Sequence, residues 1–102
     1  MSVINLTSEN FESEVILSEK NVLVDFFANR CAPCRVMSSV VVEIAEEHPE
    51  IKVCKVNVDE QSQLAARFSV ESIPTLIAFK NGIAVNSAVG SMPKRAVLKM
   101  IL

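Results

Sequence analysis

The chain has 102 residues, a formal net charge of −2 and a hydrophobic content of 50%. This length predicts one domain spanning residues 1–102, with enough apolar side chains for a core of its own. The acidic balance and the lack of a basic stripe argue against nucleic acid as a partner, and no apolar run is long enough to cross a membrane.

The first residues contain no basic segment followed by an apolar one, so we expect no signal peptide. The chain has three cysteines, two of them close together. This odd count does not predict a framework of structural disulfides. It fits a reducing compartment better, and the expected localisation is cytoplasmic.

The N-terminal half begins with a short predicted strand at residues 3–6. Thr7 is a candidate N-cap for a helix that extends through about Ser18, with Glu9 in its first turn. Residues 22–28 form a nearly continuous apolar run. Such a run is typical of a strand that is covered on both faces.

Residues 32–47 predict a long helix, because apolar side chains recur along one face: Met37, Val40, Val41, Ile44 and Ala45. Pro49 ends this helix. Residues 51–58 split into two alternating sets of side chains, which indicates a strand. Residues 22–58 therefore form a strand–helix–strand unit, which predicts parallel pairing with a right-handed crossover.

The second half continues with a short helix at about residues 61–68, a strand at 76–79 and a returning strand at 83–89. Between these strands Asn81-Gly82 predicts a hairpin turn. Pro93 suits the first turn of a last helix. Five strands and four helices in this order predict an α/β domain of three layers, a central mixed five-stranded sheet flanked by four helices.

Cys31 and Cys34 lie three residues apart where the long helix begins. In a helix such residues face the same side with Cβ atoms roughly 5–6 Å apart, close to the spacing a disulfide needs. Closing so short a loop restricts the unfolded chain little, which favours a redox switch over a structural cross-link. A reduced structural pair or half of a metal site remains open at this point.

A metal site is not predicted, since four ligands would be needed and only Cys54 and His48 remain, in unsuitable places. Cys54 lies on the apolar face of a strand, where we expect it to pack as a small hydrophobic residue. His48 is expected near solvent at the end of the long helix.

These motifs together resemble the thioredoxin family over nearly the whole chain. The matching segments are residues 24–28, the Cys-Ala-Pro-Cys motif at 31–34, residues 55–59, residues 73–76, residues 79–82 and Gly90. The resemblance implies the thioredoxin fold and thiol–disulfide exchange, with no cofactor beyond a redox-active Cys31–Cys34 disulfide. It further implies a general protein-disulfide reductase with disulfide-containing client proteins and a thioredoxin-reductase-type electron donor. We expect a monomer.

The resemblance also implies roles for individual residues. Cys31, at a helix N-terminus, is the expected attacking thiolate, and Cys34 is the expected resolving thiol. Asp25 is the expected proton acceptor toward Cys34, since burial would raise its pKa; an aspartate at the solvated end of the strand is the alternative. Lys55 is expected either to pair with Asp25 across adjacent strands or to be exposed.

A substrate surface is expected around the two cysteines, formed by Arg30, Ala32, Pro33, Ile73, Pro74 and Gly90. Pro74 is expected in the cis form, and the backbone of Ile73 would offer an edge to an extended substrate segment. A plain structural turn is the alternative for this segment.

The motif departs from the common family pattern, since Arg30 stands where a Trp is usual and Ala32 where a Gly is usual, and the chain has no Trp. The guanidinium of Arg30 would favour the Cys31 thiolate, so we expect a lowered Cys31 pKa. Two further functions remain open: a specialised thiol oxidoreductase that serves one partner, and a non-catalytic thioredoxin-fold binding module. Retention of both cysteines argues against the second.

Overall fold

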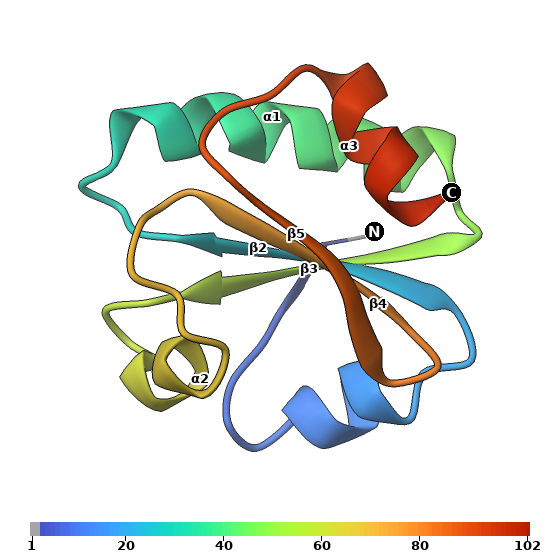
Figure 1. Cartoon of the computed structure of the whole chain (residues 1–102), viewed down its shortest axis with the longest axis horizontal. Helices are drawn as coiled ribbons and strands as arrows, with labels where there is room; N and C mark the ends of the chain where they lie inside the picture. The colour runs from blue at the N-terminus through green and yellow to red at the C-terminus, as the bar shows by residue number, and fades with distance from the viewer. Residues whose placement is uncertain (1–2) are drawn as a thin grey trace.

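The computed structural model describes residues 3–102, and its elements follow the predicted order (Figure 1). They are β1 (Val3–Asn5), η1 (Glu12–Ile16), β2 (Asn21–Phe27), α1 (Ala32–Glu47), β3 (Ile51–Asn57), α2 (Ser62–Arg67), β4 (Thr75–Lys80), β5 (Ile83–Val89) and α3 (Lys94–Ile101). No helix in this part of the chain is both long and apolar enough to span a membrane.

The strands form one mixed sheet in the order β1-β3-β2-β4-β5. β1, β3 and β2 pair in parallel, and β4 and β5 complete the sheet in antiparallel pairs. β2 lies at the centre and is buried from Val22 to Phe26, because strands flank both its edges and helices cover both its faces. The predicted covered strand and the parallel pairing are confirmed.

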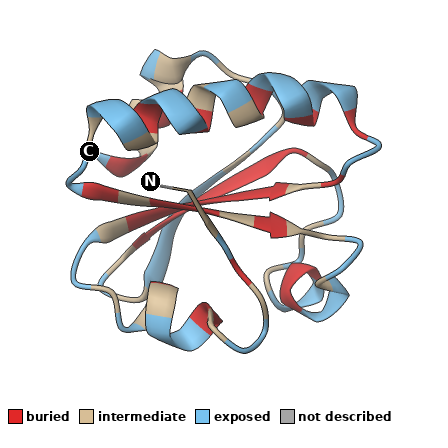
Figure 2. Cartoon of the chain, turned by 180° about the vertical axis from the view of Figure 1, so that it is seen from behind, coloured by how far each residue is buried: buried red, intermediate tan, exposed pale blue. Residues whose placement is uncertain are grey.

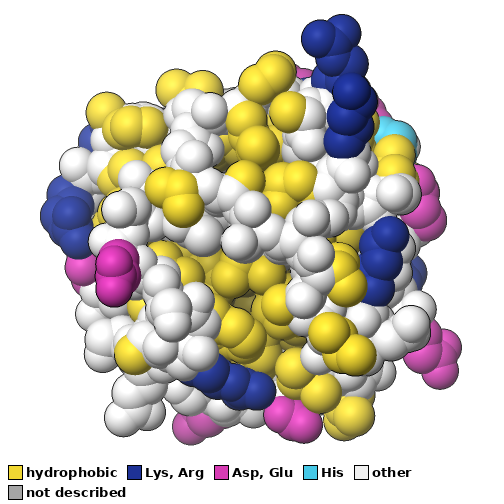
Figure 3. Space-filling model, in the orientation of Figure 1, with side chains coloured by type: hydrophobic (Ala, Val, Ile, Leu, Met, Phe, Trp, Pro, Cys, Tyr) yellow, Lys and Arg dark blue, Asp and Glu magenta, His cyan; other side chains and the backbone are white. Residues whose placement is uncertain are grey.

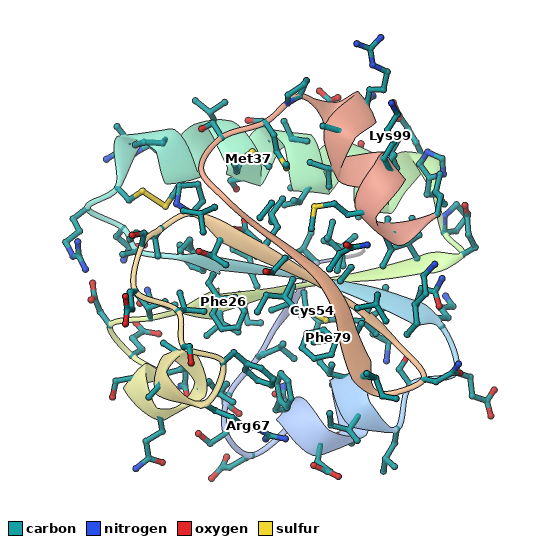
Figure 4. The ribbon with its side chains drawn as sticks, viewed as in Figure 1. Phe26, Met37, Cys54, Arg67, Phe79 and Lys99 are labelled. Atoms are coloured by element: carbon teal, nitrogen blue, oxygen red, sulfur yellow. A yellow bond between two sulfur atoms is a disulfide. The ribbon has the colours of Figure 1, made fainter. Side chains whose placement is uncertain are left out.

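Two helical layers cover the two faces of the sheet (Figures 1 and 2). Consecutive strand residues point to opposite faces, so Leu23 packs in the core under α1 and α3, and Val24 packs in the core under η1. In Figure 4, Met37 lies above the sheet, and Cys54 and Phe79 lie on its other side. The chain therefore has the predicted three-layer α/β architecture.

The N-terminal helix differs from the prediction. Thr7 does accept hydrogen bonds through its Oγ1 from the N–H groups of Glu9 and Asn10, at 3.2 and 3.3 Å. Residues 8–10 are nevertheless a turn, and the helix that follows is a short π-helix, Glu12–Ile16. Thr7 and Asn10 cap each other's backbone N–H groups, which satisfies the first turn. The helix is wider than predicted because the Leu17 N–H donates to the Glu12 carbonyl, five residues earlier, at 3.0 Å.

The C-terminal elements agree closely with the sequence. Asn81 and Gly82 have φ angles of 54° and 76°, the left-handed pair that a tight two-residue hairpin requires. Pro93 is the N-cap of α3 instead of lying in its first turn, a difference of one residue. Val97 and Ile101 of α3 are buried, as expected.

β5 is an edge strand and is largely exposed. Figure 3 shows apolar side chains gathered on the face where β5 lies in front in Figure 1. The exposed large apolar residues of this strand are Ile83, Val85 and Val89. Their exposure shows that the helical layers leave most of both faces of β5 uncovered.

Candidate active site

Cys31 and Cys34 form a disulfide at the N-terminal end of α1, with Cα atoms 5.3 Å apart; it is the yellow sulfur–sulfur bond in Figure 4. Cys31 is the N-cap of α1, and its Sγ accepts a hydrogen bond from the Cys34 N–H at 3.2 Å. Its sulfur therefore lies at the positive end of the helix dipole, where a thiolate is stabilised.

The two cysteines differ in exposure. Cys31 is 9% exposed and Cys34 only 3%. An attacking thiolate must reach a disulfide on another molecule, whereas a resolving thiol acts within the protein. The geometry thus fits the predicted division of roles, which remains a prediction.

Asp25 lies on β2, on the same sheet face as Leu23, the face that α1 covers. It is completely buried, and neither carboxylate oxygen has a hydrogen-bond partner among residues 3–102. Burial raises the pKa of this carboxyl to about 6, against an opposing effect of the Lys55 charge. An unpartnered buried carboxylate is costly, which argues for a functional role over an aspartate at a solvated strand end.

Lys55 is the register partner of Asp25 on the adjacent strand β3. Its Nζ lies over the ring of Phe27, 4.4 Å from the ring centroid, and does not hydrogen-bond to Asp25. Lys55 therefore acts on Asp25 through its charge alone. The two predicted alternatives are pairing with Asp25 and exposure to solvent, and the structure shows a state between them. The Lys55 charge lowers the Asp25 pKa, yet the Lys55 side chain is only half-buried.

A cavity of about 170 Å³ lies beside Cys34. Its lining residues are Phe27, Ala28, Asn29, Cys34, Arg35, Ser38 and Lys55. The volume is sufficient for several water molecules, so solvent reaches the neighbourhood of Cys34. Sequence reasoning did not predict Arg35 or Ser38 here, although Ser38 lies one helical turn after Cys34 and could have been placed by that spacing.

The loop around Pro74 has the predicted form, because the Ile73–Pro74 peptide bond is cis. The N–H of Gly90 donates to the Pro74 carbonyl at 2.8 Å. The next residue, Ser91, donates through its hydroxyl to the Pro33 carbonyl at 3.4 Å. These contacts bring three predicted residues of the substrate surface, Pro33, Pro74 and Gly90, to one end of the molecule.

Arg30 and Ala32 flank Cys31, and both are exposed. Arg30 forms an ion pair with Asp59 in the loop between β3 and α2, with Nη2–Oδ1 and Nε–Oδ2 distances of 3.2 and 3.3 Å. Asp59 was not predicted as a site residue. The 29 positions that separate it from Arg30 give no local signal of the contact.

The remaining cysteine and the histidine lie outside the site. Cys54 is a free, fully buried thiol whose pKa burial raises to about 12, so its predicted packing role is confirmed. His48 follows α1 and pairs through Nδ1 with Glu50 at 3.0 Å, near solvent as expected. Within residues 3–102, no three His, Cys, Asp or Glu side chains cluster as metal ligands would.

Comparison with known proteins places this geometry in context. The family model described as Thioredoxin matches residues 2–102. A thioredoxin of Pyropia yezoensis is 48% identical over 95 residues, covering 92% of this chain and 89% of the relative. Thioredoxin 1 of Nostoc sp. is 48% identical over 90 residues, covering 87% and 84%. A thioredoxin of Streptomyces clavuligerus is 42% identical over 95 residues, covering 93% and 89%.

Proposed function

The chain belongs to the thioredoxin family, and from that membership we propose that this thiol–disulfide oxidoreductase serves as a general protein-disulfide reductase. The observation that carries the proposal is the Cys31–Cys34 disulfide at the N-terminus of α1, next to a sheet face that holds the buried Asp25. A dithiol at this position can give two electrons to a client disulfide and take them back from a reductase.

The exchange proceeds in two steps. The Cys31 thiolate attacks one sulfur of a client disulfide, a mixed disulfide forms, and the other client sulfur leaves as a thiolate. Cys34 then attacks Cys31 Sγ, which re-forms the intramolecular disulfide and releases the second client thiolate. The client disulfide is reduced to a dithiol, and the Cys31–Cys34 dithiol is oxidised by the same two electrons.

The second step needs a proton acceptor, because Cys34 is buried and must lose its proton to attack. Asp25 suits this role, since a carboxyl with a pKa of about 6 exchanges protons readily near neutral pH. The cavity lined by Cys34 and Lys55 would admit water to Cys34, and this water would pass the proton toward Asp25, the register partner of Lys55. Lys55 would favour the ionised carboxylate through its charge.

The proposed substrate surface surrounds Cys31. The exposed Arg30, Ala32 and Pro33 precede or open α1, and the segment with Ile73 and cis-Pro74 is joined to Gly90 by a backbone hydrogen bond. Disulfide-containing proteins would bind there in extended form. We propose that a thioredoxin-reductase-type donor restores the dithiol and that the protein works in the cytoplasm as a monomer.

Turnover of insulin disulfides with NADPH and a thioredoxin reductase tests the proposal. The parent should reduce insulin continuously, and Cys31→Ser and Cys34→Ser should each lower the rate to background. Cys54→Ser is the matched control and should retain the parent rate, since Cys54 is buried away from the site. Cys34→Ser should also accumulate mixed disulfides with clients; full insulin turnover by Cys31→Ser would contradict the proposal.

A specialised oxidoreductase with a narrow client range is the second candidate. The exposed Arg30–Asp59 ion pair favours it, because it puts charged groups beside Cys31 where a flat apolar Trp is usual. In that case Cys34→Ser would trap one partner in place of many, and the parent would turn over insulin poorly while Cys31 remained reactive.

A further inference from the structure

An exposed ion pair includes the residue before Cys31, and neither step of the proposed exchange gives Asp59 a role. Arg30 immediately precedes Cys31 in the turn before α1, and Asp59 belongs to the loop between β3 and α2. Their two contacts, at 3.2 and 3.3 Å, join the guanidinium fork to both carboxylate oxygens. Two-point contacts of this kind fix the orientation of an arginine side chain, and not only its distance.

The Asp59 side of the pair is held in place by its own loop. The Asn57 Oδ1 accepts hydrogen bonds from the N–H groups of Asp59 and Glu60, at 2.9 and 3.2 Å. The N–H of Val58 donates to the carbonyl of Phe27 at 2.8 Å. The loop is thus fastened to the end of β2, directly before the turn that carries Arg30, and Asp59 has a defined position from which to bind the guanidinium.

We propose that Asp59 is a positioning residue that sets the thiolate fraction of Cys31 by holding and partly neutralising Arg30. Without Asp59, the guanidinium next to Cys31 would act on the thiolate with its full charge and could swing toward it. With Asp59 in place, an opposite charge within 3.3 Å offsets that field and holds the guanidinium against the β3–α2 loop. The inference rests on Cys31 being the attacking thiol of the proposed function.

Other charged residues belong to the elements around the dithiol. Lys55 and Arg35 line the cavity beside Cys34, Asp25 is the register partner of Lys55, and Glu60 follows Asp59 in its loop. Together with the dipole of α1 they set the baseline reactivity of Cys31. Substitutions at Arg30 and Asp59 remove none of these other charged groups. Differences in Cys31 reactivity among such variants therefore measure the effect of the ion pair itself.

The test is the rate of Cys31 alkylation by iodoacetamide in the reduced protein, followed by mass spectrometry between pH 5 and 9 at low salt. At about pH 6, Asp59→Asn should raise this rate roughly two- to threefold, and Arg30→Gln should lower it by a similar factor. In the Arg30→Gln background, the effect of Asp59→Asn should fall to less than half. Asp59→Glu, which keeps the charge, should restore a rate close to that of the parent.

Two controls distinguish the effect of the Arg30–Asp59 pair from the effect of changing any surface charge. Glu47→Gln removes one partner of another exposed ion pair, Lys94–Glu47, at the far end of α1, and should leave the rate unchanged. At about 0.5 M salt, the difference between Asp59→Asn and the parent should largely vanish, because exposed charges are screened.

The proposal is overturned if Asp59→Asn alkylates at the parent rate, or if its effect is equally large with and without Arg30. The second result would mean that Asp59 acts on Cys31 directly. Alkylation requires neither a client nor an electron donor, so this experiment fails or succeeds independently of insulin reduction.

Discussion

At the scale of single residues, Asp25 dominates the electrostatics of the site. Its carboxyl is buried without a hydrogen-bond partner in the described part of the chain, and its pKa is raised from 3.8 to about 6. The folded state therefore binds a proton on Asp25 more tightly than the unfolded state does. Stability is retained below the unfolded pKa and falls as the pH rises through the folded one.

We expect the free energy of unfolding of the oxidised protein to fall by up to about 3 kcal/mol between pH 4 and 8 because of Asp25, since each pKa unit corresponds to about 1.4 kcal/mol. Asp25→Asn does not titrate and should lack this part of the fall. Urea unfolding at both pH values measures the difference. Asp59→Asn, which changes an exposed aspartate, is the control, and its unfolding free energy should fall with pH as that of the parent does. An equal pH dependence of the unfolding free energy in the parent and in Asp25→Asn would contradict the prediction.

At the scale of elements, the β4–β5 hairpin depends on Gly82. Its φ is 76°, and a Cβ added there would lie 2.6 Å from the carbonyl oxygen of Ile16 in η1. Glycine thus allows both the turn and the close packing of the hairpin on the π-helix. The neighbouring Asn81 is also left-handed, with φ 54°, but already carries a Cβ without such a clash.

We expect Gly82→Ala to destabilise the protein by about 1–3 kcal/mol, because it adds a backbone cost and a steric one. Asn81→Ala is the matched control, since it adds only the backbone cost, and should be the milder change. Urea unfolding at one pH compares the two. Insulin reduction by folded Gly82→Ala should equal that of the parent, because the hairpin lies at the opposite end of the sheet from the disulfide (Figure 1). A larger loss in Asn81→Ala would refute the steric argument.

At the scale of the whole molecule, two cores share one sheet. Ile44 of α1 packs in the core on one face, and Cys54 of β3 packs in the core on the other. Since the same strands supply side chains to both cores, we propose that residues 1–102 unfold as one domain. Loss of packing on one face of the sheet should then expose the buried side chains on the other face as well.

Cys54 provides the measurement, because it is the free buried thiol of the oxidised protein. Ile44→Val should destabilise the chain by about 0.5–1.5 kcal/mol and raise the rate of Cys54 alkylation about two- to twelvefold, in proportion to the unfolded fraction. Val42→Ala, at a partly exposed position of the same helix, should change the rate little. If Ile44→Val loses stability by urea unfolding and Cys54 labelling stays at the parent rate, the two cores unfold separately.

The sequence by itself determined the order of elements, the hairpin at Asn81-Gly82 and the spacing of Cys31 and Cys34. Each of these depends on local rules, such as apolar periodicity, the φ angles open to glycine, or the reach of one helical turn. The N-terminal helix shows where local rules are insufficient. The Thr7 cap is present, yet η1 takes the wider π form, in which the Leu17 N–H donates to the Glu12 carbonyl.

Only the tertiary structure decided how the charged groups of the site meet. It buried Asp25 without a partner, placed Lys55 over a phenyl ring beside it, and joined Arg30 to Asp59 across 29 positions. The physical reason is that pKa values and ion pairs depend on which side chains from distant segments share one low-dielectric or exposed environment. Residue type and spacing identified the dithiol, and the folded chain determined the charges that surround it.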